Sequence, residues 1–296
     1  MTLMIALIGE QPLPNLLPIR HYHPDKVLLI YSDRTKPVYD RLEATLRQEV
    51  KVYGLQTHAF DIVTIVEALK QELTQHKDLI SQPMSFNLTG GTKAMALAAY
   101  QVAQLYKAPV FYLQSEGKQN QVYHYIWMDG QLRLDSKAVL PECVRLVDLF
   151  NIHFGPRKWD EYGPKRSEGS PFEEVLSETL REQGYEVMMG VKAMNGQIDI
   201  DVAIRFENRF AIIEAKAGNS GKKLDGIKQL SNAVRHIGTY TQTFYAITVQ
   251  QETAHEAIAD ASRIKIISLT GYDFDRHTLS EDDTSLLIST IDGALR

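Results

Sequence analysis

The feature that most constrains the fold of this chain is an alternating stretch at residues 197–216, QIDIDVAIRFENRFAIIEAK. Isoleucine and valine alternate with aspartate and alanine over residues 198–204, which is typical of a β-strand with one buried face. Residues 206–209, Phe-Glu-Asn-Arg, interrupt this strand before a second apolar run at residues 210–213. Two short strands joined by a polar turn form a β-hairpin, so we expect a hairpin here.

The charged side chains of this hairpin are predicted to meet. Successive side chains of a strand point to opposite faces, so Asp199 and Asp201 share a face, and so do Glu214 and Lys216. One register therefore gathers Asp201, Glu214 and Lys216 around a point between the strands. Neighbouring carboxylates repel each other unless a positive charge lies between them, and their oxygens suit Mg²⁺ or Mn²⁺. A lysine beside such an ion orients water or stabilises charge developing on a phosphate.

An exposed hairpin with a surface Glu–Lys pair is the alternative, because E-x-K triplets are common. The aspartate thirteen residues before Glu214, on the paired strand, favours the metal site. The pattern resembles the core of PD-(D/E)xK nucleases, in which a helix glutamate and a strand aspartate precede E-x-K on the next strand. The spacing of that family matches Asp201, and Asp199 then stands in place of an acidic residue two positions earlier.

The helix glutamate of such a core is sought in the amphipathic segment 172–184. At 100° per residue, Glu173 lies at the edge of the apolar stripe, whereas Glu174 points almost opposite, into solvent. Glu178 is expected on the surface. The resemblance therefore implies a catalytic set of Glu173, Asp201, Glu214 and Lys216, with Asp201, Glu214 and Glu173 as metal ligands.

Other polar residues that follow this core in the sequence allow two interpretations. Gln229 and His236, on the helix after E-x-K, either orient substrate or lie on a solvated helix face, and the second interpretation is favoured. Lys222, Lys223 and Lys228 either contact a phosphate backbone or are surface lysines with no assigned partner.

Residues 1–140 show strands alternating with helices, which predicts a mostly parallel α/β sheet of the Rossmann type. Strands are expected at residues 3–8, 27–31, 84–88 and 110–113, helices at 38–48, 62–73 and 94–106, and a terminal hairpin at 123–134.

A glycine-rich loop lies between a strand and a helix in the stretch NLTGGTKAMALAAY, which contains Thr89, Gly90, Gly91, Thr92 and Lys93. This geometry points backbone N–H groups and the helix dipole at whatever lies above the strand ends. Thr92 is expected to cap the helix, and Lys93 adds a cation. The loop lacks the spacing of a Walker motif and of G-x-G-x-x-G, so a tight turn with a capped helix is an equal alternative.

Two further loops are expected at the same edge of the sheet, because ligands of open α/β sheets bind outside the carboxyl ends of the strands. The loop residues are Gly9, Glu10, Gln11 and Pro12 after the first strand, and Ser32, Asp33 and Thr35 after the second. Together with the glycine-rich loop, they predict a ligand that carries phosphate or resembles a nucleotide.

The stretches GEQPLPNLLPI and NLTGGTKAMALAAY resemble the CARF sensor domains of type III CRISPR systems. The second half of the chain resembles the PD-(D/E)xK domain fused to such sensors in effectors of the Card and Can type. The resemblance covers nearly the whole chain and implies a Rossmann-like CARF domain at residues 1–140, a connecting segment at 141–165, and a restriction-endonuclease-like domain at 166–296.

The same resemblance implies a function. Cyclic tetra-adenylate would activate a metal-dependent endonuclease, with Mn²⁺ or Mg²⁺ as cofactor and DNA and/or RNA as substrate. The chain has room for one sensor copy, so a homodimer is needed to build a symmetric ligand site. Two alternatives stay open: a ligand-sensing regulator that binds nucleic acid without cutting it, and a ring nuclease that degrades its own activator in the first domain.

Composition limits the setting in which the chain works. No run approaches the roughly 18 apolar residues of a membrane span, and the apolar amino terminus lacks the basic segment and cleavage site of a signal peptide. The single Cys143 excludes an intrachain disulfide and a cysteine zinc cluster, which favours a reducing cytoplasm. A formal net charge of −5 argues against a protein that coats nucleic acid permanently, but it leaves local basic patches open.

Overall fold

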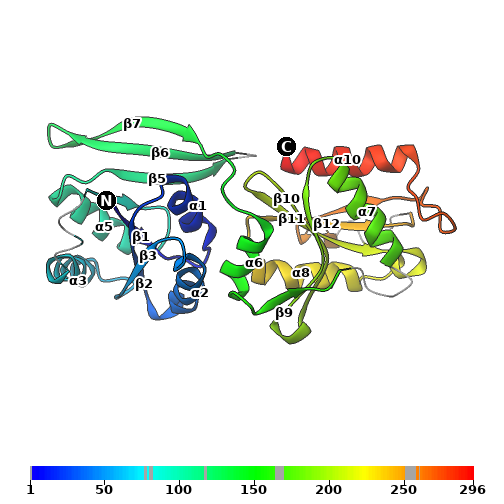
Figure 1. Ribbon diagram of the computed structural model, residues 1–296, viewed down its shortest axis with the longest axis horizontal. Coiled ribbons are helices and arrows are strands. Elements are labelled where there is room, and N and C mark those ends of the chain that lie inside the picture. The colour runs from blue at the N-terminus through cyan, green and yellow to red at the C-terminus, as the bar shows by residue number, and fades with distance from the viewer. Residues whose placement is uncertain are drawn as a thin grey trace. The chain divides into compact units, whose positions relative to one another are not determined.

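The computed structural model describes residues 2–76, 79, 83–116, 119–163, 170–250, 258–259 and 261–296. The chain forms two compact units (Figure 1). The first comprises Met1–Val144 and Asn151–Pro156, and the second comprises Arg145–Phe150 and Arg157–Arg296. The boundaries expected at residues 140 and 165 stay a prediction, and residues 164–165 of the connecting segment lie outside the described residues.

Among its described residues, the first unit has a seven-stranded sheet with the order β3-β2-β1-β4-β5-β6-β7. Its elements are β1 (Leu3–Leu7), α1 (Leu13–Tyr22), β2 (Lys26–Tyr31), η1 (Asp33–Thr35), α2 (Lys36–Leu46), β3 (Lys51–Gln56), α3 (Ile62–Gln75), β4 (Met84–Asn87), α5 (Lys93–Leu105), β5 (Val110–Glu116), β6 (Gln119–Met128) and β7 (Gln131–Val139). The strands from β3 to β5 pair in parallel, and β6 and β7 extend the sheet as an antiparallel hairpin. The prediction of a mostly parallel α/β sheet is confirmed.

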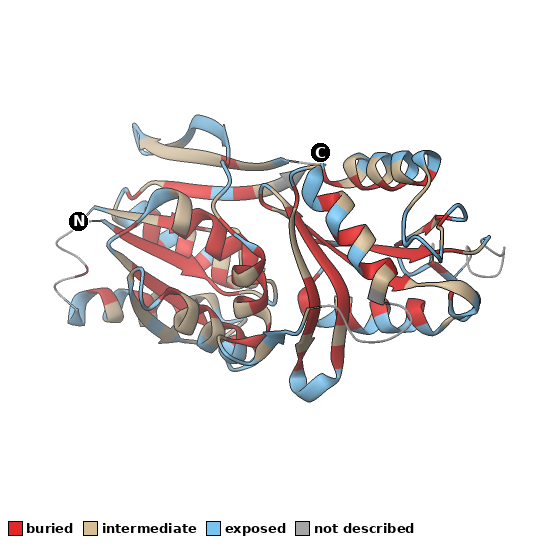
Figure 2. Cartoon of the chain, turned by 45° about the vertical axis from the view of Figure 1, so that its right-hand side comes forward, coloured by how far each residue is buried: buried red, intermediate tan, exposed pale blue. Residues whose placement is uncertain are grey.

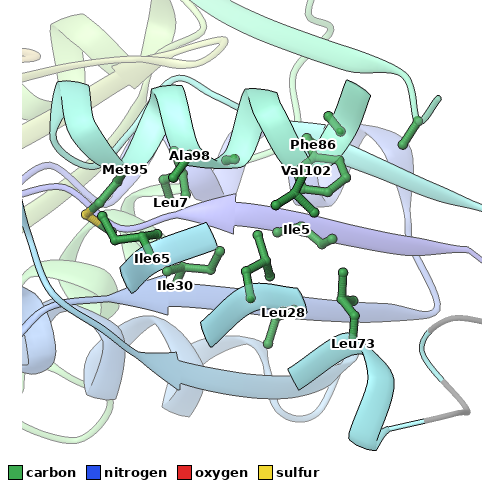
Figure 3. Packing of buried hydrophobic residues seen from close by; sticks show 14 of the residues in the cluster. Ile5, Leu7, Leu28, Ile30, Ile65, Leu73, Phe86, Met95, Ala98 and Val102 are labelled. Carbon is green, nitrogen blue, oxygen red and sulfur yellow. The ribbon is translucent and has the colours of Figure 1, made fainter. Parts of the chain in front are cut away.

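The apolar strands explain this arrangement. Every residue of β1 is buried, because β1 lies between β2 and β4 and both faces of the sheet are covered. Figure 3 shows how side chains of α3 and α5 pack on one face of the sheet. The helices contribute Ile65, Leu73, Met95, Ala98 and Val102. The strands contribute Ile5, Leu7, Leu28, Ile30 and Phe86. This core fixes the carboxyl ends of the parallel strands side by side.

Two elements of the first unit were not expected from the sequence. Helix α1 has Pro14 in its first turn, where proline is tolerated, and Pro18 inside it, where proline normally interrupts a helix. Most of its residues are nevertheless buried. Strand β3 is an edge strand that is largely exposed, so it lacks an apolar alternation. The terminal hairpin is longer than predicted for a similar reason, since β7 is almost wholly exposed.

The second unit has, in the part of the chain that is described, a six-stranded sheet with the order β13-β12-β11-β10-β9-β8. Its elements are β8 (Trp159–Glu161), α7 (Ser170–Glu182), β9 (Glu186–Ala193), η2 (Met194–Gly196), β10 (Ile198–Phe206), β11 (Arg209–Lys216), η3 (Gly218–Lys222), α8 (Asp225–Ile237), β12 (Thr241–Ile247), β13 (Ile264–Ser268) and α10 (Glu281–Leu295). Helix α6 (Leu146–Phe154) begins in this unit and ends in the first. The predicted hairpin is confirmed, since β10 pairs antiparallel with β11.

The expectation that this hairpin has one buried face is wrong. Figure 2 shows β10 and β11 buried along most of their length, and Asp201 and Ala203 are as buried as Val202. The reason is the position of β10 and β11 in the middle of the sheet, with α7 and α10 packing on one face and α8 on the other. The alternating aspartates therefore face a second packed layer.

Candidate active site and ligand pocket

Asp201, Glu214 and Lys216 lie together on the face of the second sheet that α8 covers. Val202 pairs with Ile213, so the next positions, Asp201 and Glu214, are neighbours across the strands. These two carboxylates are 1% and 2% exposed. The Lys216 Nζ atom lies 3.3 Å from Asp201 Oδ2 and forms an ion pair with Glu214 Oε1. The backbone N–H of Ala215 donates to Asp201 Oδ2 at 2.9 Å, which fixes that carboxylate.

The charges of this cluster do not cancel. Burial by itself lowers the pKa of Lys216, but the charges of Glu214 and Asp201 and their hydrogen bonds more than offset burial, so the pKa is raised above its ordinary value. Lys216 therefore stays protonated at neutral pH. One ammonium group and two carboxylates leave a net negative charge in a buried place. Such a cluster of hard oxygen ligands fits a divalent cation.

Tyr245 lies beside this cluster and was not singled out from the sequence. It pairs with Glu214 in the parallel register of β11 and β12, and it is fully buried. Burial is the main cause that raises the pKa of Tyr245 to about 12, with Lys216 opposing the shift and Glu214 adding to it. The phenol is thus neutral and donates a hydrogen bond to the Lys223 carbonyl oxygen at 3.2 Å. Only the end of an apolar strand, TFYAI, marks Tyr245 in the sequence.

Glu173 belongs to α7, whose Phe172 and Leu176 pack with Val202 and Ile213. It is 4% exposed on α7, while Glu174 and Glu178 are exposed, so the orientation inferred from the apolar stripe agrees with the structure. Within the described residues, however, no group of three or more His, Cys, Asp or Glu side chains is arranged to hold a metal ion. The role of Glu173 as a third ligand stays a prediction, as does that of Asp199, which is half-buried opposite Lys192.

The remaining candidates of the second unit are surface residues. Gln229 and His236 are exposed on α8, as the favoured interpretation held. Lys222, Lys223 and Lys228 are exposed as well, at or just before the start of the same helix.

A pocket of about 890 Å³ lies at the carboxyl ends of the parallel strands of the first unit. Seven of the predicted ligand-binding residues line it: Gly9, Glu10, Ser32, Asp33, Thr35, Gly91 and Thr92. Five do not, namely Gln11, Pro12, Thr89, Gly90 and Lys93. The pocket therefore lies at the edge of the sheet where a ligand site was expected. Of the glycine-rich loop, only Gly91 and Thr92 line it, fewer residues than predicted.

Thr89 and Gly90 are turned towards the protein. The Thr89 hydroxyl donates to Asn87 Oδ1 at 2.6 Å and accepts from the Leu113 N–H at 2.8 Å. Gly90 lies so close to the end of β1 that an added Cβ would overlap the Leu7 carbonyl oxygen. These two residues hold the loop on the strand ends, whereas Gly91 and Thr92 face the pocket.

Thr92 joins two of the pocket loops. Its hydroxyl oxygen accepts from the Met95 N–H at 3.2 Å, which confirms the predicted helix cap. The same hydroxyl donates to the carbonyl oxygen of Ala59 in the loop after β3. Thr92 thus fixes the glycine-rich loop against a neighbouring loop.

The loop after β3 was missed because β3 was not recognised as a strand. Its pocket-lining residues are Gln56, Thr57, His58, Ala59 and Phe60, and Ile8, Arg34 and Met95 complete the lining. Arg34 pairs with Glu10 at the rim, and Asp33 lines the pocket beside them. The signal that could have found this loop is the helical pattern at residues 62–73, because strands alternate with helices in the first unit and a strand is expected before each helix.

Comparison with known proteins identifies both units. Residues 3–140 match the family model of the Card1 CARF domain, and residues 165–276 match that of a restriction endonuclease. The chain is a CARF domain joined to a restriction-endonuclease domain. This confirms the predicted fold class, an α/β CARF domain followed by a restriction-endonuclease-like domain.

Solved structures share this fold at low sequence identity. Can2 from Sulfobacillus thermosulfidooxidans, in complex with cyclic tetra-adenylate, is 14% identical with a TM-score of 0.75, and all of both chains is covered. Protein VC1899 from Vibrio cholerae is 13% identical with a TM-score of 0.71, covering 99% of this chain and 98% of its own. A type III CRISPR defence DNA nuclease activated by cyclic oligoadenylate is 18% identical with a TM-score of 0.61, covering 83% of this chain and 45% of its own.

The search among curated proteins gave no match. None of the helices in the described part of the chain is long and apolar enough to cross a membrane.

Proposed function

We propose that this CARF nuclease is an endonuclease that a cyclic oligoadenylate switches on, and that it acts in the cytoplasm as part of type III CRISPR defence. The observation that carries the proposal is the buried cluster of Asp201, Glu214 and Lys216 within a restriction-endonuclease domain. Its two carboxylates and one lysine are the groups that phosphodiester hydrolysis requires, and the motif is intact, which argues against a regulator that only binds nucleic acid.

Each residue of the cluster has a role in this proposal. Asp201 and Glu214 hold Mn²⁺ or Mg²⁺, and Glu173 completes the ligand set. The ion, when bound, polarises the phosphodiester and lowers the pKa of a bound water. Lys216, already protonated between the carboxylates, stabilises the negative charge that develops on the phosphate. Because these groups contact only a phosphodiester, they act on DNA and RNA alike.

The activator is proposed to be cyclic tetra-adenylate, the ligand present in the Can2 structure. The 890 Å³ pocket offers backbone N–H groups at the start of α5 and the Arg34 guanidinium, which suit phosphate groups. A ring of four identical nucleotides has two-fold symmetry. We therefore expect a homodimer in which each subunit contributes one pocket to the ring.

A cleavage assay tests this function against its alternatives. The chain is incubated with plasmid DNA or single-stranded RNA, with Mn²⁺ or EDTA, and with or without cyclic tetra-adenylate. Cleavage that requires both the metal and the activator is the expected result. Binding of nucleic acid without cleavage would support a regulator, and loss of the activator itself would support a ring nuclease. Cleavage at full rate without activator would contradict the sensor role of the first unit.

Thr92 and Lys93 form a matched pair for testing the sensor. Thr92→Ala removes the helix cap and the bond to Ala59, and losing such a cap costs about 1–2 kcal/mol. We expect activator affinity to fall about five- to thirtyfold. Lys93→Ala is the control, because Lys93 is exposed and outside the pocket lining, and its affinity should stay within about twofold of wild type. Calorimetry measures the activator affinity of both variants. If Lys93→Ala bound the activator more weakly than Thr92→Ala, Lys93 and not Thr92 would belong to the ligand site.

A further inference from the structure

The segment that follows E-x-K, residues 217–223 with the sequence AGNSGKK, is held against the strands that carry the carboxylates. We call it the basic loop. At its start, the Gly218 N–H donates to Thr248 Oγ1 at 2.7 Å, and the Thr248 N–H donates in turn to the Lys216 carbonyl oxygen at 3.3 Å. The loop therefore begins in a fixed position directly beside Lys216.

The end of the basic loop is fixed by Tyr245. Its hydroxyl donates to the Lys223 carbonyl oxygen, and its ring lies against Gly226 in the first turn of α8, where an added Cβ would overlap the ring. Tyr245 is also the neighbour of Glu214 in the sheet. One buried side chain thus connects the strand carboxylate site with the end of the basic loop.

The basic loop presents Lys222 and Lys223 to solvent. Within the described residues, neither side chain forms an ion pair, although acidic Asp225 is two residues away from Lys223. The backbone of Lys223 is held by Tyr245 beside the carboxylate cluster, and two exposed lysines at this place fit a polyanion that passes over the cluster. A nucleic acid backbone has this chemistry, since phosphate contacts position a strand without reading its sequence.

We propose that Tyr245 is a positioning residue that holds the basic loop over the carboxylate cluster, and that Lys222 and Lys223 bind substrate phosphates next to the one that is cut. This assignment rests on the proposed nuclease function and names the groups that place its substrate. Tyr245 acts through the loop and does not touch the reacting atoms.

The phosphate contacts are tested by the salt dependence of binding. The full chain, saturated with cyclic tetra-adenylate, is titrated with a 30-base-pair duplex DNA in EDTA, so that no strand is cut. Each lost phosphate contact lowers the slope of log K against log salt by about 0.9. We expect Lys222→Ala with Lys223→Ala to lower it by about 1.8 in total. An unchanged slope would overturn the phosphate contacts.

Tyr245→Phe tests the anchor, because it keeps the ring and removes only the hydroxyl. We expect DNA affinity to fall about two- to tenfold, the loss of one hydrogen bond, and the amides of residues 217–224 to exchange with solvent faster. Tyr185→Phe is the matched control, since the Tyr185 hydroxyl donates to Asp292 on α10 within the same unit. Equal amide exchange in both variants would overturn the anchor.

The two readouts separate this assignment from the proposed function. Neither binding in EDTA nor amide exchange requires cleavage, so a wild-type chain that fails to cut DNA and RNA with Mn²⁺ refutes the proposed nuclease alone. A chain that cuts normally, yet shows unchanged slopes and unchanged exchange in the variants, refutes the role of the basic loop alone.

Discussion

Asp201→Asn and Glu214→Gln are each expected to slow nucleic acid cleavage by a factor on the order of 10²–10³ or more, at least the loss seen when one preorganised hydrogen-bond donor is removed from an oxyanion hole. Both substitutions keep the shape of the side chain. The asparagine still accepts the Ala215 N–H through its amide oxygen, so the strand geometry is preserved. Each substitution removes one of the two negative charges that hold the ion, so metal affinity is lost with activity.

Thermal unfolding in EDTA and in Mn²⁺ checks this prediction independently of cleavage. A ligand that binds only the folded state stabilises it by about 2.7 kcal/mol at 100 times its dissociation constant. Wild type should gain this stability with Mn²⁺, and the two variants should gain almost none. In EDTA the variants should be at least as stable as wild type, because two buried carboxylates with one lysine repel each other.

Glu174→Gln is the control on the nuclease unit, since Glu174 is exposed on α7. It should cleave and bind Mn²⁺ like wild type, while Glu173→Gln should lose activity if Glu173 completes the ligand set. An active Asp201→Asn variant with a normal Mn²⁺ response would remove the cluster from the active site. If Glu174→Gln were inactive and Glu173→Gln were active, the ligand would be Glu174 and the surface residue Glu173.

The hairpin site was predictable because strand periodicity is strict. A one-residue shift in register would move Asp201 to the other face, where apolar side chains of α7 and α10 pack. Asp201, Glu214 and Lys216 therefore follow from the pattern of one short stretch. The contribution of Tyr245 does not, because its neighbour Glu214 is set by the pairing of β11 with β12, which are separated by α8 in the sequence.

Helix periodicity predicted that Glu173 is buried, but it did not predict which residues pack around Glu173. The 100° rule separates the buried face of α7 from the exposed one and does not say which face of the sheet receives the helix. In the structure, Phe172 and Leu176 pack with Val202 and Ile213, the positions that alternate with the carboxylates. Asp201 and Glu214 point to the other face, so the sequence pattern alone left the distance from Glu173 undetermined.

The position of the pocket in the CARF domain was predicted from the sequence, but only part of its lining was. The rule that ligands bind at the carboxyl ends of parallel strands located the edge at which the pocket lies, and Gly9, Ser32 and Thr92 line that pocket. It missed the loop after β3 because an exposed edge strand has no apolar alternation. It included Thr89 and Gly90 because a glycine-rich loop does not reveal which of its residues contact the protein.

Gly90→Ala is expected to weaken the response to the activator strongly. The new Cβ overlaps the Leu7 carbonyl oxygen, the same oxygen that accepts a hydrogen bond from Asn15 Nδ2 at 3.0 Å. Both Leu7 and Asn15 are fully buried, so neither can move aside without cost. Overpacking of this kind costs about 1–3 kcal/mol, and an unsatisfied buried group costs about 1–3 kcal/mol more.

The loop relieves the overlap by moving away from β1, which displaces Gly91 and Thr92 from the pocket. We expect activator affinity to fall on the order of a hundredfold, with activator-dependent cleavage lost at low ligand concentrations. The Mn²⁺-induced rise in unfolding temperature should persist, because the carboxylate cluster belongs to the other unit. Calorimetry with cyclic tetra-adenylate and the thermal assay measure the two effects separately.

Gly293→Ala is the matched control for Gly90→Ala. Gly293 lies inside α10, a Cβ there meets no atom of the described residues within 4 Å, and alanine is favoured over glycine in a helix by about 0.8–1 kcal/mol. This variant should be slightly more stable than wild type and respond normally to the activator. A Gly90→Ala chain that bound the activator as tightly as Gly293→Ala would show that the close fit of the glycine-rich loop on β1 does not shape the ligand site.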